Sequence, residues 1–316
     1  MNQSDILRKI GIKIGHCTNN NDLTGVTVFI AEKGAEIGID IRGSSTGTLN
    51  TPAYDPKSSG KIVHAVTLTG GSIFGLESAF GVLEYLEEQG IGNTKFGNKA
   101  IPGITGAVIY DLGVGTERRP TKQSGYEAAV NSSYSNLIQG NIGVGTGATI
   151  GKWFDGEKTK GGFGIATKTL ASDIIIAAFV VTNAMGDIVQ RDNPDGNRRN
   201  SWYDEMSLEK FKKFSGLLDL ASQNTTLAVI ATNVRMNKIQ LMKVAELAHD
   251  GMARSIYPVH TNLDGDVIFA LSSLAGERIE PPLEDIVLVD LIGLAAADAL
   301  LEAIENSVKS VTNPLR

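Results

Sequence analysis

Short apolar runs rich in Val and Ile alternate along this chain with longer segments in which apolar residues recur at helical spacing. The runs predict strands at 26–31, 35–41, 63–68, 105–112, 161–169, 172–181, 227–231 and 267–271. Helices are expected at 72–89, 126–137, 237–255 and 286–308. Several strands are apolar on both faces, so each face needs a cover. We therefore expect one α+β domain over residues 1–316, with two sheets packed between two helical layers.

One junction stands out, where the polar segment 204–223 gives way to the apolar strand 227–231. Thr225 lies at the entry to that strand. Its hydroxyl is placed to attack the carbonyl of Asn224 in an N-to-O acyl shift that breaks the chain. The new terminal Thr225 would then carry a nucleophile and a base together, as its hydroxyl and its α-amine. Asn224 tolerates strained backbone geometry, but Asn-Thr-Thr is also an ordinary turn into a strand, and this stretch leaves both interpretations open.

The amino-acid composition of the chain excludes several classes of protein. Apolar residues make up 42% of the 316 residues, charged residues 20%, and the net charge is −6, which is ordinary globular composition without a basic tract for nucleic acid. A single cysteine, Cys17, excludes an internal disulfide framework. No apolar run reaches the ~20 residues of a membrane span, and residues 1–13 have no signal-peptide core. We expect a cytoplasmic protein that binds neither nucleic acid nor membrane.

Two glycine-rich stretches resemble phosphate sites only superficially. The turn formed by Thr69, Gly70, Gly71 and Ser72 joins a strand to a helix, yet it lacks both known phosphate-loop spacings. It is a structural turn or, if functional, part of a substrate-binding site. The run 143–152 ends in Lys152 without a following Ser or Thr, so a nucleotide loop is not favoured. Lys152 is either a solvated lysine or a half-buried cation that polarises a carbonyl.

The histidines favour neither a metal site nor a catalytic triad. None of His16, His64, His249 and His260 pairs at metal-ligand spacing. The G-x-S-x-G elbow of a Ser-His-Asp hydrolase is also missing. We therefore expect no metal and no cofactor. The missing motifs favour a mechanism that needs no histidine, such as that of an N-terminal nucleophile.

Four further polar residues stand near strand ends. Asp264 and Asp266 flank Gly265 before the strand 267–271, where they suit either a hairpin turn or two acids that orient the amine and hydroxyl of Thr225. Asn183 closes the strand that begins at 172, and Tyr110 lies near the end of strand 105–112. Each either has a structural role or donates a hydrogen bond to an oxyanion.

With these features together, the sequence resembles the DmpA-like peptidase family, which comprises L-aminopeptidase/D-esterases, β-aminopeptidases and endo-type nylon oligomer hydrolases. The similarity covers nearly the whole chain. It is carried by the stretches 67–72, 107–112, 145–148 and 225–233. The resemblance implies a four-layer αββα sandwich, self-cleavage between Asn224 and Thr225, and a homotetramer of the processed α chain (1–224) and β chain (225–316).

The resemblance also implies roles for single residues. Thr225 matches the nucleophile, and Lys152, Asn183 and Tyr110 match active-site positions of the family. Asp264 and Asp266 match a pair that is acidic in the nylon oligomer hydrolases and is Ser and Glu in the aminopeptidase branch. Thr at position 225, where the aminopeptidases carry Ser, also resembles the nylon hydrolase branch.

We therefore expect an N-terminal-nucleophile hydrolase that cleaves amide bonds of short peptides, amino-acid amides or 6-aminohexanoate (nylon) oligomers through an acyl-enzyme on Thr225. Gly70, Gly71 and Ser72 are expected to bind the substrate. Two other functions stay open. One is acyl transfer of the ornithine acetyltransferase type, in which an amine replaces water as acceptor. The other is a non-catalytic binding protein that uses the glycine-rich loops.

Overall fold

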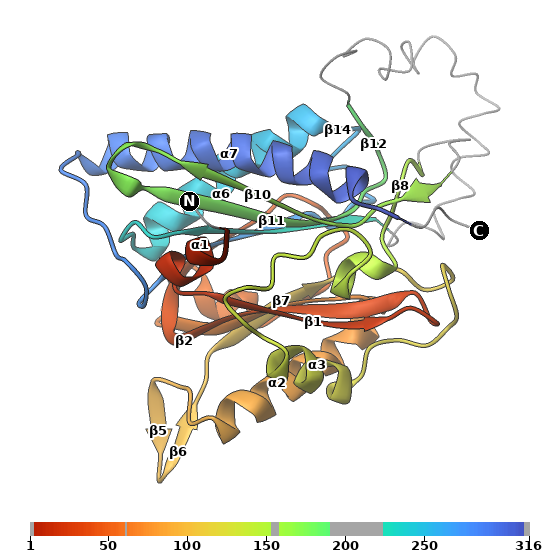
Figure 1. The fold of residues 1–316 in the computed structure, drawn as a ribbon, viewed down its shortest axis with the longest axis horizontal. Helices are drawn as coiled ribbons and strands as arrows, with labels where there is room; N and C mark the ends of the chain where they lie inside the picture. The colour runs from red at the N-terminus through yellow and green to blue at the C-terminus, as the bar shows by residue number, and fades with distance from the viewer. Residues whose placement is uncertain (1–2, 61, 153–157, 190–223, 313–316) are drawn as a thin grey trace.

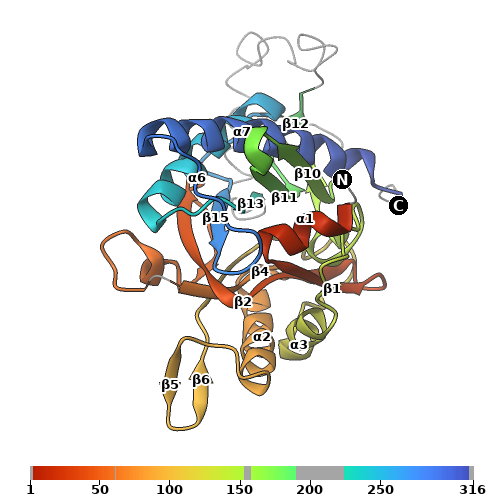
Figure 2. The same cartoon turned by 60° about the vertical axis from the view of Figure 1, so that its left-hand side comes forward.

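The computed structural model describes residues 3–60, 62–152, 158–189 and 224–312, so the polar segment before Thr225 lies outside it. Nine strands form two stacked layers (Figures 1 and 2). The first layer has the order β10 (Phe163–Thr169), β11 (Ile175–Asn183), β13 (Thr225–Thr232), β15 (Val267–Ser273) and β2 (Thr24–Ile41). The second contains β1 (Lys13–Asn19), β2, β4 (Ile62–Thr69), β7 (Ile104–Val108) and β3 (Thr48–Leu49).

Strand β2 belongs to both layers. Its residues 35–41 pair with β15, whereas 24–30 pair with β1 and 26–30 with β4. The prediction of two separate strands here was wrong, because the chain stays extended over 18 residues. An irregularity in the pairing with β4, between Ile30 and Ala35, includes Gly34 at a φ of 85°. Such a bulge bends a strand and lets it leave one sheet for the other.

Helices cover the outer face of each layer, which confirms the four-layer αββα sandwich (Figure 1). Helices α6 (Lys238–Ser255) and α7 (Asp285–Lys309) cover the first layer, and α2 (Glu77–Glu88) and α3 (Lys122–Val130) cover the second. The short helix α1 (Gln3–Ile10) adds apolar side chains to the core between the sheets. Phe29 from the second layer meets Phe179 from the first in that core, with ring centroids 5.2 Å apart.

Local signals explain where two helices begin. The Asn237 side chain accepts hydrogen bonds from the backbone of Ile239 and Gln240, and the Gln240 side-chain oxygen accepts one from the Asn237 N–H. This pattern confirms the predicted capping box of α6. Helix α3 was predicted at 126–137, but it begins at Lys122 and ends at Val130. Thr121 caps it, with its N–H bonded to the Ser124 hydroxyl, and this polar start had no apolar periodicity to mark it.

The remaining elements are short. The two-residue to three-residue strands are β5 (Thr94–Phe96), β6 (Lys99–Ile101), β8 (Thr149–Ile150), β9 (Thr159–Lys160), β12 (Asp187–Ile188) and β14 (Ile256–Tyr257). Single 3-10 turns span Thr51–Tyr54, Ser72–Leu76, Gly143–Thr146 and Ala171–Asp173. Within the described part of the chain, no helix combines the length and apolarity needed to cross a bilayer.

Candidate active site

Thr225 is the first residue of β13, a strand of eight residues that are all buried, as the apolar pattern predicted. It is 3% exposed, and its hydroxyl donates to the carbonyl oxygen of Asn224 at 2.5 Å. Strand β13 lies between the antiparallel β11 and the parallel β15. The end of β13 where Thr225 lies is therefore surrounded by the ends of both neighbouring strands.

Asn183 is the last residue of β11 and the direct register partner of Thr225. Its side-chain oxygen accepts hydrogen bonds from the Thr149 N–H at 2.9 Å and from the Lys152 ammonium at 3.1 Å. Lys152 also donates to the Asn183 carbonyl at 3.0 Å. Removal of the Lys152 ammonium from water lowers its pKa to about 7, although the Asp264 carboxylate opposes this shift. The sequence predicted that Lys152 and Asn183 belong to one site, and in the structure the two residues are hydrogen-bonded to each other.

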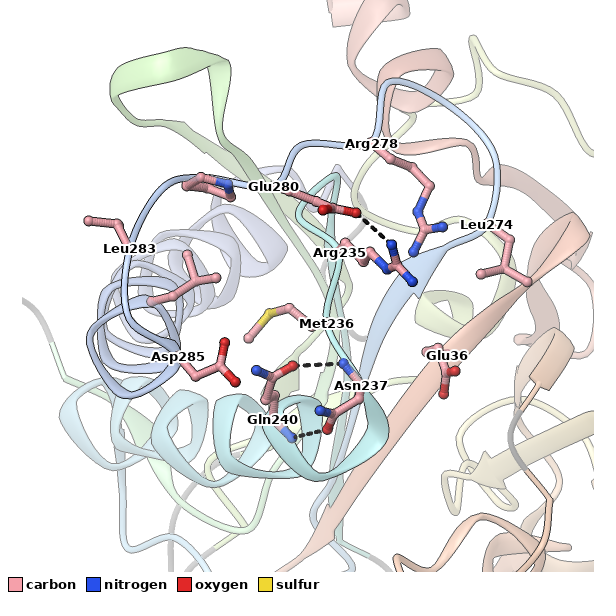
Figure 3. Close-up of a pocket in the computed structure, with 12 residues that line it drawn as sticks. Glu36, Arg235, Met236, Asn237, Gln240, Leu274, Arg278, Glu280, Leu283 and Asp285 are labelled. Carbon is pink, nitrogen blue, oxygen red and sulfur yellow. Dashed lines mark hydrogen bonds and ion pairs between the residues drawn. The ribbon is translucent and has the colours of Figure 1, made fainter.

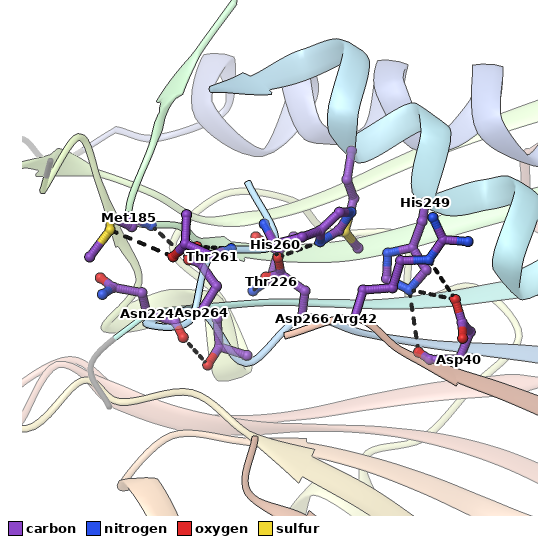
Figure 4. Close-up of polar contacts among 12 residues, drawn as sticks. Asp40, Arg42, Met185, Asn224, Thr226, His249, His260, Thr261, Asp264 and Asp266 are labelled. Atoms are coloured by element: carbon purple, nitrogen blue, oxygen red, sulfur yellow. Dashed lines mark hydrogen bonds and ion pairs between the residues drawn. The ribbon is translucent and has the colours of Figure 1, made fainter. Parts of the chain in front are cut away.

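Asp264 and Asp266 come just before β15, the strand that pairs with the other edge of β13 (Figure 4). Asp264 faces Asn224 in an isolated parallel bridge, and Asp266 accepts the Thr226 N–H at 2.7 Å. Burial, and the nearby Asp266 carboxylate, raise the pKa of Asp264 to about 6. The hairpin-turn alternative is excluded, because β15 pairs with β13 and β2.

His260 is a member of this cluster that the sequence did not predict. Its backbone has a φ of 56°, and its Nδ1 lies 2.8 Å from the second oxygen of Asp266. The ring also stands edge-on to His249 at 4.7 Å, and His249 contacts the Asp40 carbonyl (Figure 4). Metal-ligand spacing and a triad motif are the two signals by which a histidine marks a site in a sequence. A histidine six residues before Asp266 carries neither signal.

Tyr110 and the turn at 69–72 are placed differently from the prediction. Strand β7 ends at Val108, so Tyr110 lies in the loop beyond it, and its backbone carbonyl accepts a hydrogen bond from the Asn183 amide at 3.2 Å. The Gly71 N–H donates to Asp111 at 2.7 Å, and so does the Thr24 hydroxyl. Burial raises the pKa of Asp111 to about 6. The turn therefore wraps a buried carboxyl next to Tyr110, and its role in substrate binding stays a prediction.

A cavity of about 520 Å³ lies at the opposite end of β13 and contains none of the predicted site residues (Figure 3). Its walls carry the Arg235–Glu280 ion pair and the start of α6 at Asn237. Among the residues that the structure describes, no three His, Cys, Asp or Glu side chains gather as they would around a metal ion. The Thr225 cluster is therefore the stronger candidate for chemistry.

The arrangement suits acyl transfer. The buried Thr225 hydroxyl contacts the Asn224 carbonyl. The Asn183 amide and the Lys152 ammonium lie on the side of β11, and the Asp264 and Asp266 carboxylates lie on the side of β15. Such a constellation supplies a nucleophile, donors for a developing negative charge, and acceptors for a proton.

Known proteins are similar to this chain over most of its length. A model of Peptidase family S58 matches residues 6–313. An uncharacterized aminopeptidase of Mycobacterium leprae is 37% identical over 300 residues, covering 89% of this chain and 81% of that protein. A 6-aminohexanoate-oligomer endohydrolase of Paenarthrobacter ureafaciens is 34% identical over 274 residues, covering 83% of this chain and 73% of that one.

A solved structure is similar over nearly the whole chain. The L-aminopeptidase D-Ala-esterase/amidase of Ochrobactrum anthropi, described as a variant of the Ntn hydrolase fold, superposes with a TM-score of 0.68 at 18% identity, covering 96% of this chain and 86% of that one. At this identity the likeness concerns the fold, which is that of the N-terminal-nucleophile hydrolases.

Proposed function

Because the chain belongs to Peptidase family S58 and is a hydrolase, we propose that it matures by self-cleavage between Asn224 and Thr225 and then cleaves amide bonds with Thr225. The observation that carries the proposal is the 2.5 Å contact between the Thr225 hydroxyl and the carbonyl oxygen of Asn224 at the start of a buried strand. The two products are an α chain, 1–224, and a β chain, 225–316.

Self-cleavage needs no second reactant except water. The Thr225 Oγ forms a bond to the Asn224 carbonyl carbon, the bond from that carbon to the Thr225 nitrogen breaks, and the hydroxyl proton ends on the nitrogen. Water then hydrolyses the resulting ester. This leaves a carboxylate on Asn224 and a free amine on Thr225.

In the mature enzyme the α-amine of Thr225 acts as base while Oγ attacks the substrate carbonyl. The Asn183 amide and the Lys152 ammonium, on the strand boundary opposite Thr225, stabilise the oxyanion. Asp264 and Asp266 lie on the amine side and hold it in position. Water then releases the acyl group from Thr225.

The substrates that we propose are short peptides, amino-acid amides or 6-aminohexanoate oligomers. One observation favours the oligomers, which is that the chain carries Thr225 with an Asp264–Asp266 pair, as the nylon oligomer hydrolase branch does. Overall identity does not separate the classes, because a 6-aminohexanoate-oligomer endohydrolase is 34% identical and an uncharacterized aminopeptidase is 37% identical. All three substrate classes present the same reacting group, an amide carbonyl.

Self-cleavage is expected to accelerate as the pH rises through about 6. We propose that Asp264, which pairs with Asn224 beside the bond to be broken, takes the Thr225 hydroxyl proton and passes it to the leaving nitrogen. Only the ionised carboxylate can take a proton, and the pKa of Asp264 is raised to about 6. Below that pH the carboxyl is protonated and the rate falls. Fragment appearance on a denaturing gel between pH 4 and 9 measures the profile. Asp264→Asn should cleave slowly without this rising limb, whereas a wild-type rate that is flat from pH 5 to 7 would contradict the assignment.

The proposed function predicts that purified protein contains two fragments, the smaller of which begins Thr-Thr-Leu. Intact mass and N-terminal sequencing test this, and hydrolysis of 6-aminohexanoate oligomers, amino-acid amides and β-peptides tests the substrate class. A chain that stays intact at every age and pH would refute the self-processing mechanism.

We further propose a homotetramer, supported by exposed Ile286 and Leu294 on one helix. Light scattering of the same sample should give the mass of four protomers.

A further inference from the structure

The carbonyl oxygen of Asn224 accepts two hydrogen bonds. One comes from the Thr225 hydroxyl at 2.5 Å, and the other from the backbone N–H of Gly265 at 2.8 Å. Asn224 is 3% exposed and Gly265 is buried, so protein groups rather than bulk water surround this oxygen. The oxygen belongs to the peptide bond that self-cleavage would break.

The Gly265 N–H is held firmly in this place. Its neighbour Asp264 pairs with Asn224, and the Asp264 carbonyl accepts the Ser45 N–H at 2.9 Å. On the other side, the carbonyl of Asp266 accepts the Arg42 N–H at 3.1 Å. The segment 264–266 is therefore bonded both to the chain at Asn224 and to the loop that follows β2.

We propose that the Gly265 N–H is the oxyanion donor of the self-cleavage step, an inference that rests on the proposed function. When Thr225 Oγ bonds to the Asn224 carbon, the negative charge develops on the oxygen that this N–H already contacts. A fixed donor at 2.8 Å needs no rearrangement to stabilise that charge. The Asn183 amide instead donates to the Tyr110 carbonyl in the uncleaved chain, so we assign it to the oxyanion of the substrate and not to that of self-cleavage.

The space around residue 265 explains why glycine stands there. A Cβ atom on Gly265 would lie 2.7 Å from the Thr225 Oγ and 2.7 Å from the Ser45 carbonyl oxygen, closer than real Cβ contacts. Any side chain would displace the attacking hydroxyl or the loop. Only glycine lets this backbone pass so close to Thr225 while its N–H contacts the Asn224 carbonyl oxygen.

The test removes one hydrogen-bond donor and keeps the shape of the backbone. Glycolic acid incorporated in place of Gly265 by nonsense suppression replaces the N–H with an ester oxygen. Because loss of one oxyanion donor costs about 10²–10³ in rate, self-cleavage should slow by about that factor. The loss of one hydrogen bond should lower Tm by only a few degrees. Rates are therefore divided by the folded fraction, measured by circular dichroism.

Glycolic acid at Gly113, an exposed loop position with open space around it, is the matched control and should cleave like wild type. Mass spectrometry distinguishes a break at 224–225 from hydrolysis of the introduced ester at 264–265. A wild-type rate per folded molecule with the ester at 265 would overturn the donor assignment and leave the proposed function standing. A wild-type chain that never breaks at 224–225 would overturn the proposed function itself.

Discussion

Thr225→Ala should remain a single chain of 316 residues and should hydrolyse amides no faster than the uncatalysed reaction. In the proposed mechanism the substitution removes the atom that attacks in both steps, and without the first step no α-amine is released to serve as base. Denaturing gels and intact mass report the first loss, and turnover of a 6-aminohexanoate oligomer or an amino-acid amide reports the second. Thr225→Ser keeps the hydroxyl and should retain both activities at a reduced rate.

The adjacent Thr226→Val is the matched control. The Thr226 hydroxyl is buried without a hydrogen-bond partner, and valine keeps the shape and the backbone N–H that Asp266 accepts. This variant should therefore cleave and turn over normally, with stability unchanged or increased. A Thr225→Ala protein that still breaks at 224–225 would remove Thr225 from the mechanism.

Asn183→Asp should lower kcat by about 10²–10³ while KM changes little, because it deletes the side-chain amide that we propose as an oxyanion donor in the transition state. The new carboxylate can still accept hydrogen bonds from the Thr149 N–H and Lys152, so the local fold keeps most of its contacts. The lost bond to the Tyr110 carbonyl costs about 1 kcal/mol. Steady-state kinetics on fully cleaved protein measure the effect.

Asn233→Asp supplies the control for this variant at the far end of β13. Asn233 also accepts a backbone N–H, from Ile175 at 2.8 Å, and donates to a backbone carbonyl, that of Asp173 at 3.0 Å. Asn233→Asp should lose about as much stability as Asn183→Asp and should keep the kcat of the wild type. If both variants lost kcat equally, the effect of Asn183→Asp would be structural.

The sequence predicted the features that depend on local pattern. Apolar runs located the buried strands, and Asn237 with Gln240 located the start of α6. The same pattern marked Thr225 as the entry to a buried strand. Long-range pairing was harder, because nothing local shows that 26–31 and 35–41 form one strand shared by two sheets.

Two parts of the candidate site left no trace in the sequence. The contact of His260 with Asp266 depends on a loop that turns at a positive φ, which a histidine does not signal. The Gly265 N–H is a backbone group, and every residue except proline has one. Its function is visible only from the atom that it contacts.

The strand order has a consequence for the two pieces of a cleaved chain. Strands β13 and β15 of the 225–316 piece stand between β11 and β2, which both belong to the 1–224 piece. Each piece thus buries its edges against the other, and neither is a folding unit by itself. The pieces would part on a denaturing gel but melt together in a single transition, and when made separately they would need to be refolded in each other's presence.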